Sequence, residues 1–269
     1  MAQTTNNIST TATKQEQHSL SIQVRLDGFS FFVRDVSSGA IRDYKSIVFD
    51  QRVDPNGLLP VLDKIYTEHA VLLNHYQKVD VIYINSLFTL VPEPLFDEAH
   101  LSDYLKFNTR LLKTDFVAYD KITSCAVMNV YIPYTNLNNF LFDRYGSFTY
   151  HHGISLLIRE QAKDLSSLPD KMVINVHPSS FDLICFKTQK LVLANAFEYQ
   201  TPEDFVYYIL FTVEQLELDP ETIQLQLTGH IQEGDALYER IYTYIRNVKL
   251  LPSIANTIPQ DDYLLSTLV

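Results

Sequence analysis

The chain has 269 residues, and 46% of them are hydrophobic, which is enough to fill one large core or two modest ones. Its 32 acidic and 21 basic side chains give a formal charge of −11, and no basic cluster interrupts the acidic background, which excludes nucleic acid as an expected partner. Two cysteines, Cys125 and Cys185, match neither a metal-ligand spacing nor a disulfide-rich pattern, which favours a reducing compartment.

The N-terminal segment, residues 1–18, is rich in Thr, Asn, Gln and Ser and contains no apolar core. We expect a disordered tail there, and neither a signal peptide nor a membrane anchor. The longest apolar run, residues 205–213, is shorter than the roughly 20 residues that a membrane-spanning helix needs. The sequence therefore predicts a cytoplasmic protein without membrane insertion.

Alternation of apolar and polar residues begins at Leu20, and Asp27-Gly28 supplies the residues preferred in a tight hairpin turn. A helical spacing of apolar residues follows later in this half. The predicted elements are strands over 20–26, 29–35 and 40–49, a helix over 57–76 and a strand over 79–85. Their order is strand, strand, strand, helix, strand.

The same order recurs about 150 residues later. The predicted elements are strands over 172–178, 181–187 and 190–199, a helix over 201–218 and a strand over 223–229. Thr201 followed by Pro202 is typical of a helix N-terminus. This helix is apolar nearly all round, so we expect it to lie deep between layers and to bury Tyr207, Tyr208 and Phe211.

The segment between the two units completes the first half. It is predicted to contain helices over 97–108 and 135–145, strands over 115–122, 125–133 and 147–152, and a helix beginning near 154. We expect a first lobe over 19–163, a linker over 164–171 and a second lobe over 172–269, each a mixed five-stranded sheet flanked by helices in an α/β fold. An acidic amphipathic insertion around 92–108 is a candidate protein-binding segment, the alternative being a solvated helix.

The duplicated unit resembles the actin-like ATPase fold, in which each half is ribonuclease-H-like. The most specific match is "VINVHPSSFDLICFKTQKLVLANAF" (173–197), which is similar to the second phosphate hairpin of bacterial cell-division and pilus-assembly actin-like proteins. The family has Asp-x-Gly at this turn, whereas this chain has Asn175 and His177. Ser179 and Ser180 keep the small hydroxyl positions of the family pattern.

Two further segments resemble other motifs of the actin-like family, each with substitutions. "SIQVRLDGFSFFVRD" (21–35) resembles the first phosphate loop, but the position two before Gly28 is Leu26, and Asp27 lies next to the glycine. "LQLTGHIQEGDALYERI" (225–241) resembles the adenosine-binding segment, in which Gly229 matches and His230 replaces a second glycine. The resemblance covers most of 19–250 and is closest to an uncharacterised bacterial family of unknown function with this fold.

An actin-type ATPase needs carboxylates that hold Mg²⁺ through water and glycines that let backbone N–H groups approach phosphate. Asn175 brings no negative charge, and the imidazole of His177 fills space that phosphate would occupy. Turn chemistry alone explains Asp27-Gly28. These departures favour a non-catalytic protein that needs no cofactor and acts by binding another protein.

The alternative is a nucleotide-binding ATPase or small-molecule kinase of the same fold that uses ATP and Mg²⁺ in a rearranged cleft between the lobes. The residues placed at that cleft by position are Asp27, Gly28, Ser30, Asn175, His177, Ser179, Ser180 and Gly229. A filament-forming structural protein is a third class, which no sequence feature favours. One fold hosts many functions, so the resemblance does not choose among these classes.

Two other groups of residues suggest chemistry at first sight. His177, Ser180 and Asp182 have the residue types of a nucleophilic triad, but no GxSxG turn presents the serine and the strand spacing argues against a triad. His151 and His152 are adjacent in a strand, so their side chains diverge, which favours structural or capping roles over metal binding.

Overall fold

The computed structural model describes residues 18–107, 109, 111–112, 115–163 and 170–269. The expected tail, apart from His18, and most of the expected linker at 164–171 lie outside these residues. None of the described helices is long and apolar enough to cross a membrane.

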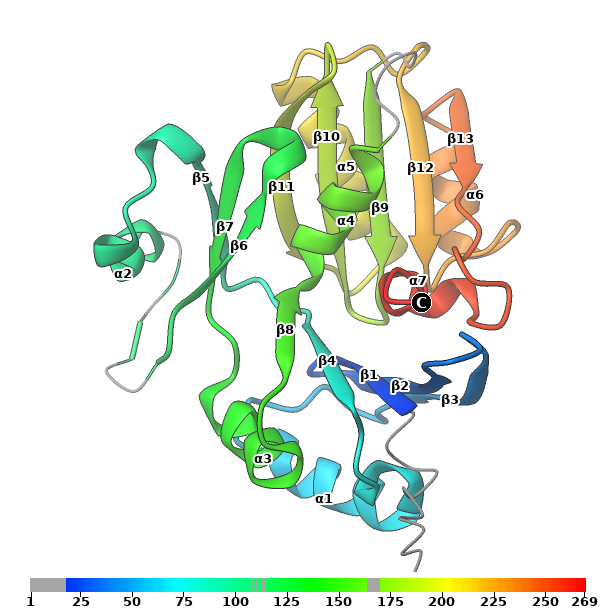
Figure 1. Ribbon diagram of the computed structural model, residues 1–269. Helices are drawn as coiled ribbons and strands as arrows, with labels where there is room; N and C mark the ends of the chain where they lie inside the picture. Colours follow the sequence, from blue (N-terminus) through cyan, green and yellow to red (C-terminus); the bar gives the residue numbers. More distant parts are fainter. Residues whose placement is uncertain (1–17, 108, 110, 113–114, 164–169) are drawn as a thin grey trace, which may run out of the picture.

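Two five-stranded sheets form the two halves of the molecule (Figure 1). The first contains β1 (His18–Val24), β2 (Gly28–Asp35), β3 (Ile41–Val48), β4 (Lys78–Tyr83) and β8 (Thr149–His152), and the second contains β9 (Lys171–Val176), β10 (Ser180–Lys187), β11 (Lys190–Glu198), β12 (Gln224–Gly229) and β13 (Asn247–Leu250). Their orders are β3-β2-β1-β4-β8 and β11-β10-β9-β12-β13. Both sheets therefore place their strands as third, second, first, fourth and fifth, which confirms the predicted duplication.

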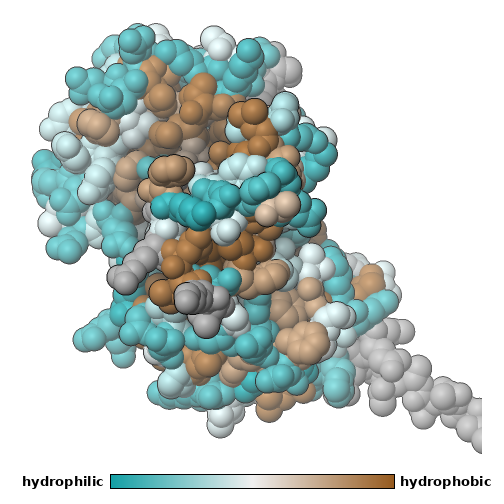
Figure 2. All heavy atoms as spheres, turned by 90° about the vertical axis from the view of Figure 1, so that its left-hand side faces the viewer, coloured by the Kyte–Doolittle hydropathy of each residue, from teal (hydrophilic) through white to brown (hydrophobic). Residues whose placement is uncertain are grey.

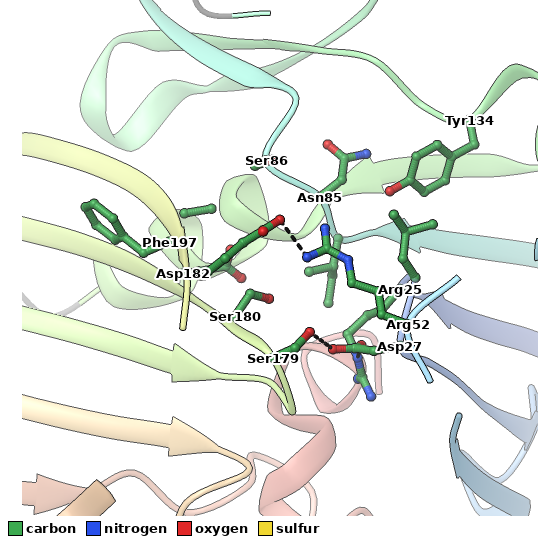
Figure 3. A pocket seen from close by; sticks show the side chains of 14 residues that line it. Arg25, Asp27, Arg52, Asn85, Ser86, Tyr134, Ser179, Ser180, Asp182 and Phe197 are labelled. Atoms are coloured by element: carbon green, nitrogen blue, oxygen red, sulfur yellow. Dashed lines mark hydrogen bonds and ion pairs between the residues drawn. The ribbon is translucent and has the colours of Figure 1, made fainter. Parts of the chain in front are cut away.

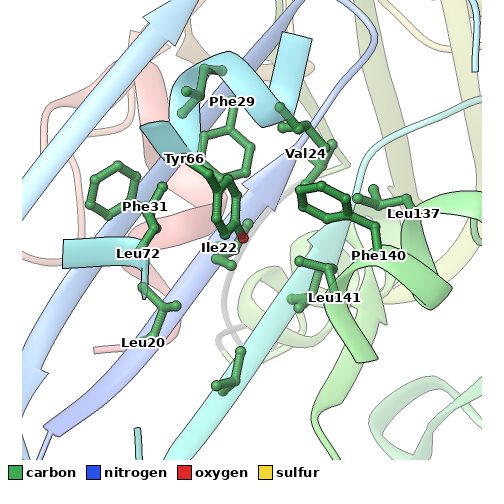
Figure 4. Close-up of a cluster of buried hydrophobic side chains, with 14 of the residues drawn as sticks. Leu20, Ile22, Val24, Phe29, Phe31, Tyr66, Leu72, Leu137, Phe140 and Leu141 are labelled. Carbon is green, nitrogen blue, oxygen red and sulfur yellow. The ribbon is translucent and has the colours of Figure 1, made fainter. Parts of the chain in front are cut away.

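Helices α1 (Leu58–Glu68) and α3 (Thr135–Tyr145) contribute to a core with the first sheet (Figure 4). In this core Tyr66 of α1 meets Phe140 of α3 edge to face, with ring centroids 5.1 Å apart. The prediction of one helix over 57–76 is wrong at its C-terminal end. The backbone leaves the helical region at His69, whose ring packs against Phe31, and a short 3₁₀ helix at Ala70–Leu73 follows.

A third sheet of three strands lies beside the other two, in the order β5-β7-β6. It consists of β5 (Phe88–Pro92), β6 (Ala118–Ile122) and β7 (Val127–Tyr131). The sequence did not predict β5, because Pro92 and Pro94 favour a loop there. The single helix predicted over 97–108 is instead a 3₁₀ turn at Glu98–His100 followed by the short helix α2 (Leu101–Leu105), and a separate 3₁₀ turn at Glu93–Leu95 precedes them.

Helix α5 (Pro202–Gln215) begins with the expected cap, in which Thr201 and Asp204 form a reciprocal capping box. The prediction that α5 is buried all round is wrong. Its inner side buries residues such as Phe205 and Ile209, while Tyr207 and Phe211 are 62% and 46% exposed. Aromatic residues on the outer side of α5 therefore gave this helix the apolar sequence that is typical of a buried helix.

The C-terminal segment joins the two lobes. A 3₁₀ turn at Gln260–Asp262 leads into α7 (Tyr263–Ser266), which packs with α4 (Gly153–Gln161). Tyr263, Leu264 and Leu265 lie in one hydrophobic cluster with residues of both large sheets, including Ile82 and Ile184. This segment is red in Figure 1 and lies where the two sheets approach each other.

Candidate functional site

The two hairpin turns meet between the lobes. The first turn spans Arg25–Gly28 and the second spans His177–Ser180, and each is closed by one backbone hydrogen bond. The Arg25 N–H donates to the Gly28 carbonyl at 2.9 Å, and the His177 N–H donates to the Ser180 carbonyl at 2.8 Å. Arg25 and His177 are therefore equivalent positions in the duplicated unit.

The turns contact each other through Asp27 (Figure 3). Its Oδ2 accepts a hydrogen bond from the Ser179 hydroxyl at 2.9 Å, and its Oδ1 accepts one from Arg25 Nε at 3.0 Å. Both Asp27 and Arg25 are buried. Burial alone would raise the pKa of the Asp27 carboxyl, but the positive charge of Arg25, the nearby His177 and the hydrogen bond from Ser179 outweigh burial and lower this pKa below 3.8.

A second buried carboxylate, Asp262, reaches the same arginine from the C-terminal segment. Its Oδ1 lies 3.6 Å from Arg25 Nη1 and accepts hydrogen bonds from Ser30 at 2.7 Å and Gln23 at 2.8 Å. Its Oδ2 accepts one from the Tyr44 hydroxyl at 2.7 Å. Asp262 therefore holds the C-terminal segment to all three antiparallel strands of the first sheet.

The second hairpin contains its own buried polar cluster. His177 Nε2 lies 3.0 Å from Asp182 Oδ2, and the Asn175 amide nitrogen lies 3.4 Å from the same oxygen. His177 Nδ1, the nitrogen left to contact Ser180 in a triad, is buried and has no hydrogen-bond partner among the described residues. This geometry agrees with the expectation that these residues form no triad.

The space left between the hairpins is small, and we call it the hairpin pocket. Its lining includes Arg25, Asp27, Asn85, Ser179, Ser180 and Asp182, and its free volume is about 40 Å³. Arg52 from the first lobe forms an ion pair across it with Glu198 from the second lobe. Ligand pockets for drug-sized molecules occupy roughly 300 to 1,000 Å³, whereas the hairpin pocket has room for a few water molecules.

Gly28 and Gly229, the glycines at the two matched positions, serve close packing. A Cβ on Gly229 would lie 2.1 Å from the Val176 carbonyl oxygen, and Gly229 has a φ of +81°. A Cβ on Gly28 would lie 2.5 Å from Arg25 Nη2 and 3.0 Å from the Ile47 carbonyl oxygen. Packing inside the protein is therefore a sufficient reason for both glycines.

The structure brings only some of the predicted site residues to one place. Asp27, Ser179 and Ser180 line the hairpin pocket. Asn175 and His177 are buried in the second hairpin, and Ser30 contacts Asp262. The residues that sequence reasoning missed are Arg25, Arg52, Asn85, Glu198 and Asp262, and Asp182 was considered only as a member of a triad. Arg25 was discoverable as the counterpart of His177 in the duplication, while Asp262 lies beyond the repeated unit.

The adjacent histidines have structural roles. His152 caps α4 by accepting a hydrogen bond from the Ile154 N–H at 3.2 Å, and His151 Nδ1 lies 2.9 Å from Asp120. Among the described residues, no three His, Cys, Asp or Glu side chains are grouped so that they could hold a metal ion. Capping is one of the two roles that the sequence left open for these histidines, and it applies to His152.

Replacing His152 should flatten the stability profile in mild acid. Burial lowers the pKa of His152 to about 4, against about 6.5 in the unfolded chain. Between these values the unfolded state binds more protons, so stability rises with pH and the full contribution of about 3 kcal/mol is present above pH 6.5. We expect the unfolding free energy, measured with urea at several pH values between 4 and 6.5, to change less with pH in His152→Gln than in the wild type. His75→Gln, whose side chain is exposed, should show the wild-type pH dependence. Equal pH dependence in the wild type and His152→Gln would contradict this assignment.

Comparison with solved structures places the chain among proteins of the actin-like ATPase fold. A protein of unknown function with this fold from Bacteroides thetaiotaomicron VPI-5482 is 25% identical, with a TM-score of 0.83, covering 95% of this chain and 96% of that one. The PilM-PilN type IV pilus biogenesis complex matches at 11% identity and a TM-score of 0.59, covering 93% of this chain and 97% of that one. The chain belongs to the family described as protein of unknown function (DUF3822), whose sequence model matches residues 6–248. The search of curated proteins gave no match.

Proposed function

We propose that this protein is a non-catalytic member of the actin-like fold that acts by binding another protein. The observation that carries the proposal is the closure of the hairpin pocket. Side chains of both hairpins contact each other directly where a nucleotide's phosphates would have to pass between them, and about 40 Å³ remains free.

The chemistry at the two hairpins supports the same proposal. Both carboxylate oxygens of Asp27 already accept hydrogen bonds, one from Arg25 and one from Ser179. Asn175 carries no charge and is directed at Asp182. A water bound to Mg²⁺ would have to share these oxygens with Arg25 and with Ser179, and the Ser179 contact is the one that joins the two hairpins.

Binding a protein partner is a function that the fold can serve without a nucleotide. The PilM structure of this fold was solved in complex with PilN, which is an example of a protein partner for the fold. Exposed aromatic side chains on this chain, such as Phe142 and Tyr207, offer contact area of the kind found in interface cores.

A calorimetric titration with ATP and Mg²⁺ tests the non-catalytic part of this proposal. We expect no saturable binding heat up to 1 mM nucleotide. A dissociation constant above 1 mM corresponds to less than about 4 kcal/mol of binding free energy. A parallel titration of Ser180→Phe, which fills the hairpin pocket, is the control for heat that arises elsewhere. Saturable binding to the wild type that Ser180→Phe abolishes, or ATP hydrolysis that it removes, would overturn the proposal and favour a nucleotide-dependent enzyme.

A further inference from the structure

A groove opens between α3 and β8, away from the hairpin pocket, and we call it the edge groove. Asn138, Asn139 and Phe142 of α3 form one wall, Phe148 and Tyr150 at β8 form the other, and Phe116 also lines it. Its volume is about 400 Å³, ten times that of the hairpin pocket. This side of the molecule faces the viewer in Figure 2, where hydrophobic residues interrupt the hydrophilic surface of the lower half.

The β8 wall of the groove is the edge of a sheet. In the order β3-β2-β1-β4-β8, β8 comes last, and β4 is its only strand neighbour within the described part of the chain. An edge strand presents backbone N–H and C=O groups that can pair with a further strand. On β8 the N–H of His152 already donates to Asp120 Oδ2 at 2.9 Å, so pairing is left to the residues that precede His152. Domains that bind extended peptides use such an edge for main-chain hydrogen bonds and adjoining pockets for alternate side chains.

The composition of the edge groove indicates the chemistry of its occupant. Phe142 and Phe116 are 61% and 49% exposed, so two aromatic rings face water. Asn138 and Asn139 add amide groups, and no lining residue of the groove carries a formal charge, although the chain as a whole has a charge of −11. Such a surface complements an uncharged segment, because a charged side chain would lose water there and find no counter-charge.

We infer that the edge groove binds an extended, uncharged apolar segment of a partner protein, which adds as a strand beside β8. The segment places an aromatic or branched side chain between Phe142 and Phe148. The side chain two residues further along points in the same direction, because side chains alternate between the two faces of a strand. The inference rests on the proposed protein-binding function and names the surface that performs it.

The test is a selection of random twelve-residue peptides displayed on phage against the full-length chain, followed by fluorescence anisotropy with the enriched peptides labelled with fluorescein. We expect enriched sequences with apolar residues at alternate positions and no charged residue between them. Phe142→Lys should weaken their binding at least tenfold. Phe211→Lys is the matched control, because Phe211 is also an exposed phenylalanine on a helix but lies in the other lobe, and it should leave binding unchanged.

Backbone N-methylation of the peptide separates strand addition from simple apolar contact. Methyl groups at alternate peptide nitrogens should abolish binding in one register and leave it within about twofold in the other, because only every second N–H faces β8. Loss of affinity in Phe211→Lys but not Phe142→Lys would overturn the edge groove while leaving a protein-binding function in place. Sedimentation showing dimers that Phe142→Lys dissociates would overturn it in favour of a contact between copies of this chain.

Discussion

Gly229→Ala should destabilise the protein by about 4 kcal/mol or prevent folding, which is among the largest effects a single methyl group can have. Gly229 ends β12 where this strand runs parallel to β9, and its neighbour there is Val176. The new Cβ would lie 2.1 Å from the Val176 carbonyl oxygen and 2.8 Å from the Val176 nitrogen. Backbone atoms cannot rotate away as a side chain can, so the two central strands of the second sheet would have to separate.

Gly234→Ala is the matched control for this change. Gly234 has a φ of +85°, close to the +81° of Gly229, but a Cβ there would meet nothing within 4 Å. It should therefore lose only the penalty of a left-handed backbone, on the order of 1 kcal/mol. Urea unfolding followed by circular dichroism measures both variants. Equal losses would show that backbone conformation, and not the contact with Val176, accounts for the glycine.

The topology of the two large sheets was predictable because it depends on local patterns. Alternating residues marked the hairpin strands, and Asp27-Gly28 marked the first turn to within one residue. The turn has Leu26 and Asp27 at its centre, and Gly28 is already the first residue of β2. The repeat of the same order in the second half then made the duplicated fold recognisable. The two hairpin turns meet between the lobes, and Asn175 and His177 are directed at Asp182.

The polar side of β1 shows why the site itself was harder to predict. Leu20, Ile22 and Val24 face the core, and the alternation suggests that the intervening residues face water. Gln23 and Arg25 are instead only 2% exposed, because the C-terminal segment covers them. The sequence of a polar strand face does not show whether water or another polar segment covers it. Asp262, the carboxylate that covers this face, is 237 residues beyond Arg25 in the sequence.

The charge balance around Arg25 predicts the second large effect. Arg25→Met removes the guanidinium that pairs with two buried carboxylates, Asp27 and Asp262, whereas Asp262→Asn leaves Arg25 paired one to one with Asp27. Removing one partner of a buried ion pair costs roughly 3 to 5 kcal/mol. We expect Arg25→Met to lie at the upper end of this range at pH 7 and Asp262→Asn at its lower end or below.

The double variant distinguishes a charge network from two independent contacts. Once Arg25 is methionine, Asp262→Asn removes a repulsive charge, so the second change should cost at least about 1 kcal/mol less than it does in the wild type. The pH response should also change sign. In the wild type the pKa of Asp27 is lowered, so its contribution is present above about pH 4 and is lost as the pH falls through the folded value. In Arg25→Met the charge that offsets burial is gone and burial raises this pKa instead, so acidification from pH 7 to 4.5 should narrow the difference in stability between the variant and the wild type, in both of which His152 titrates. Additive losses, or a stability loss relative to the wild type that grows on acidification over this range, would mean that Arg25 stabilises the junction by packing and not by its charge.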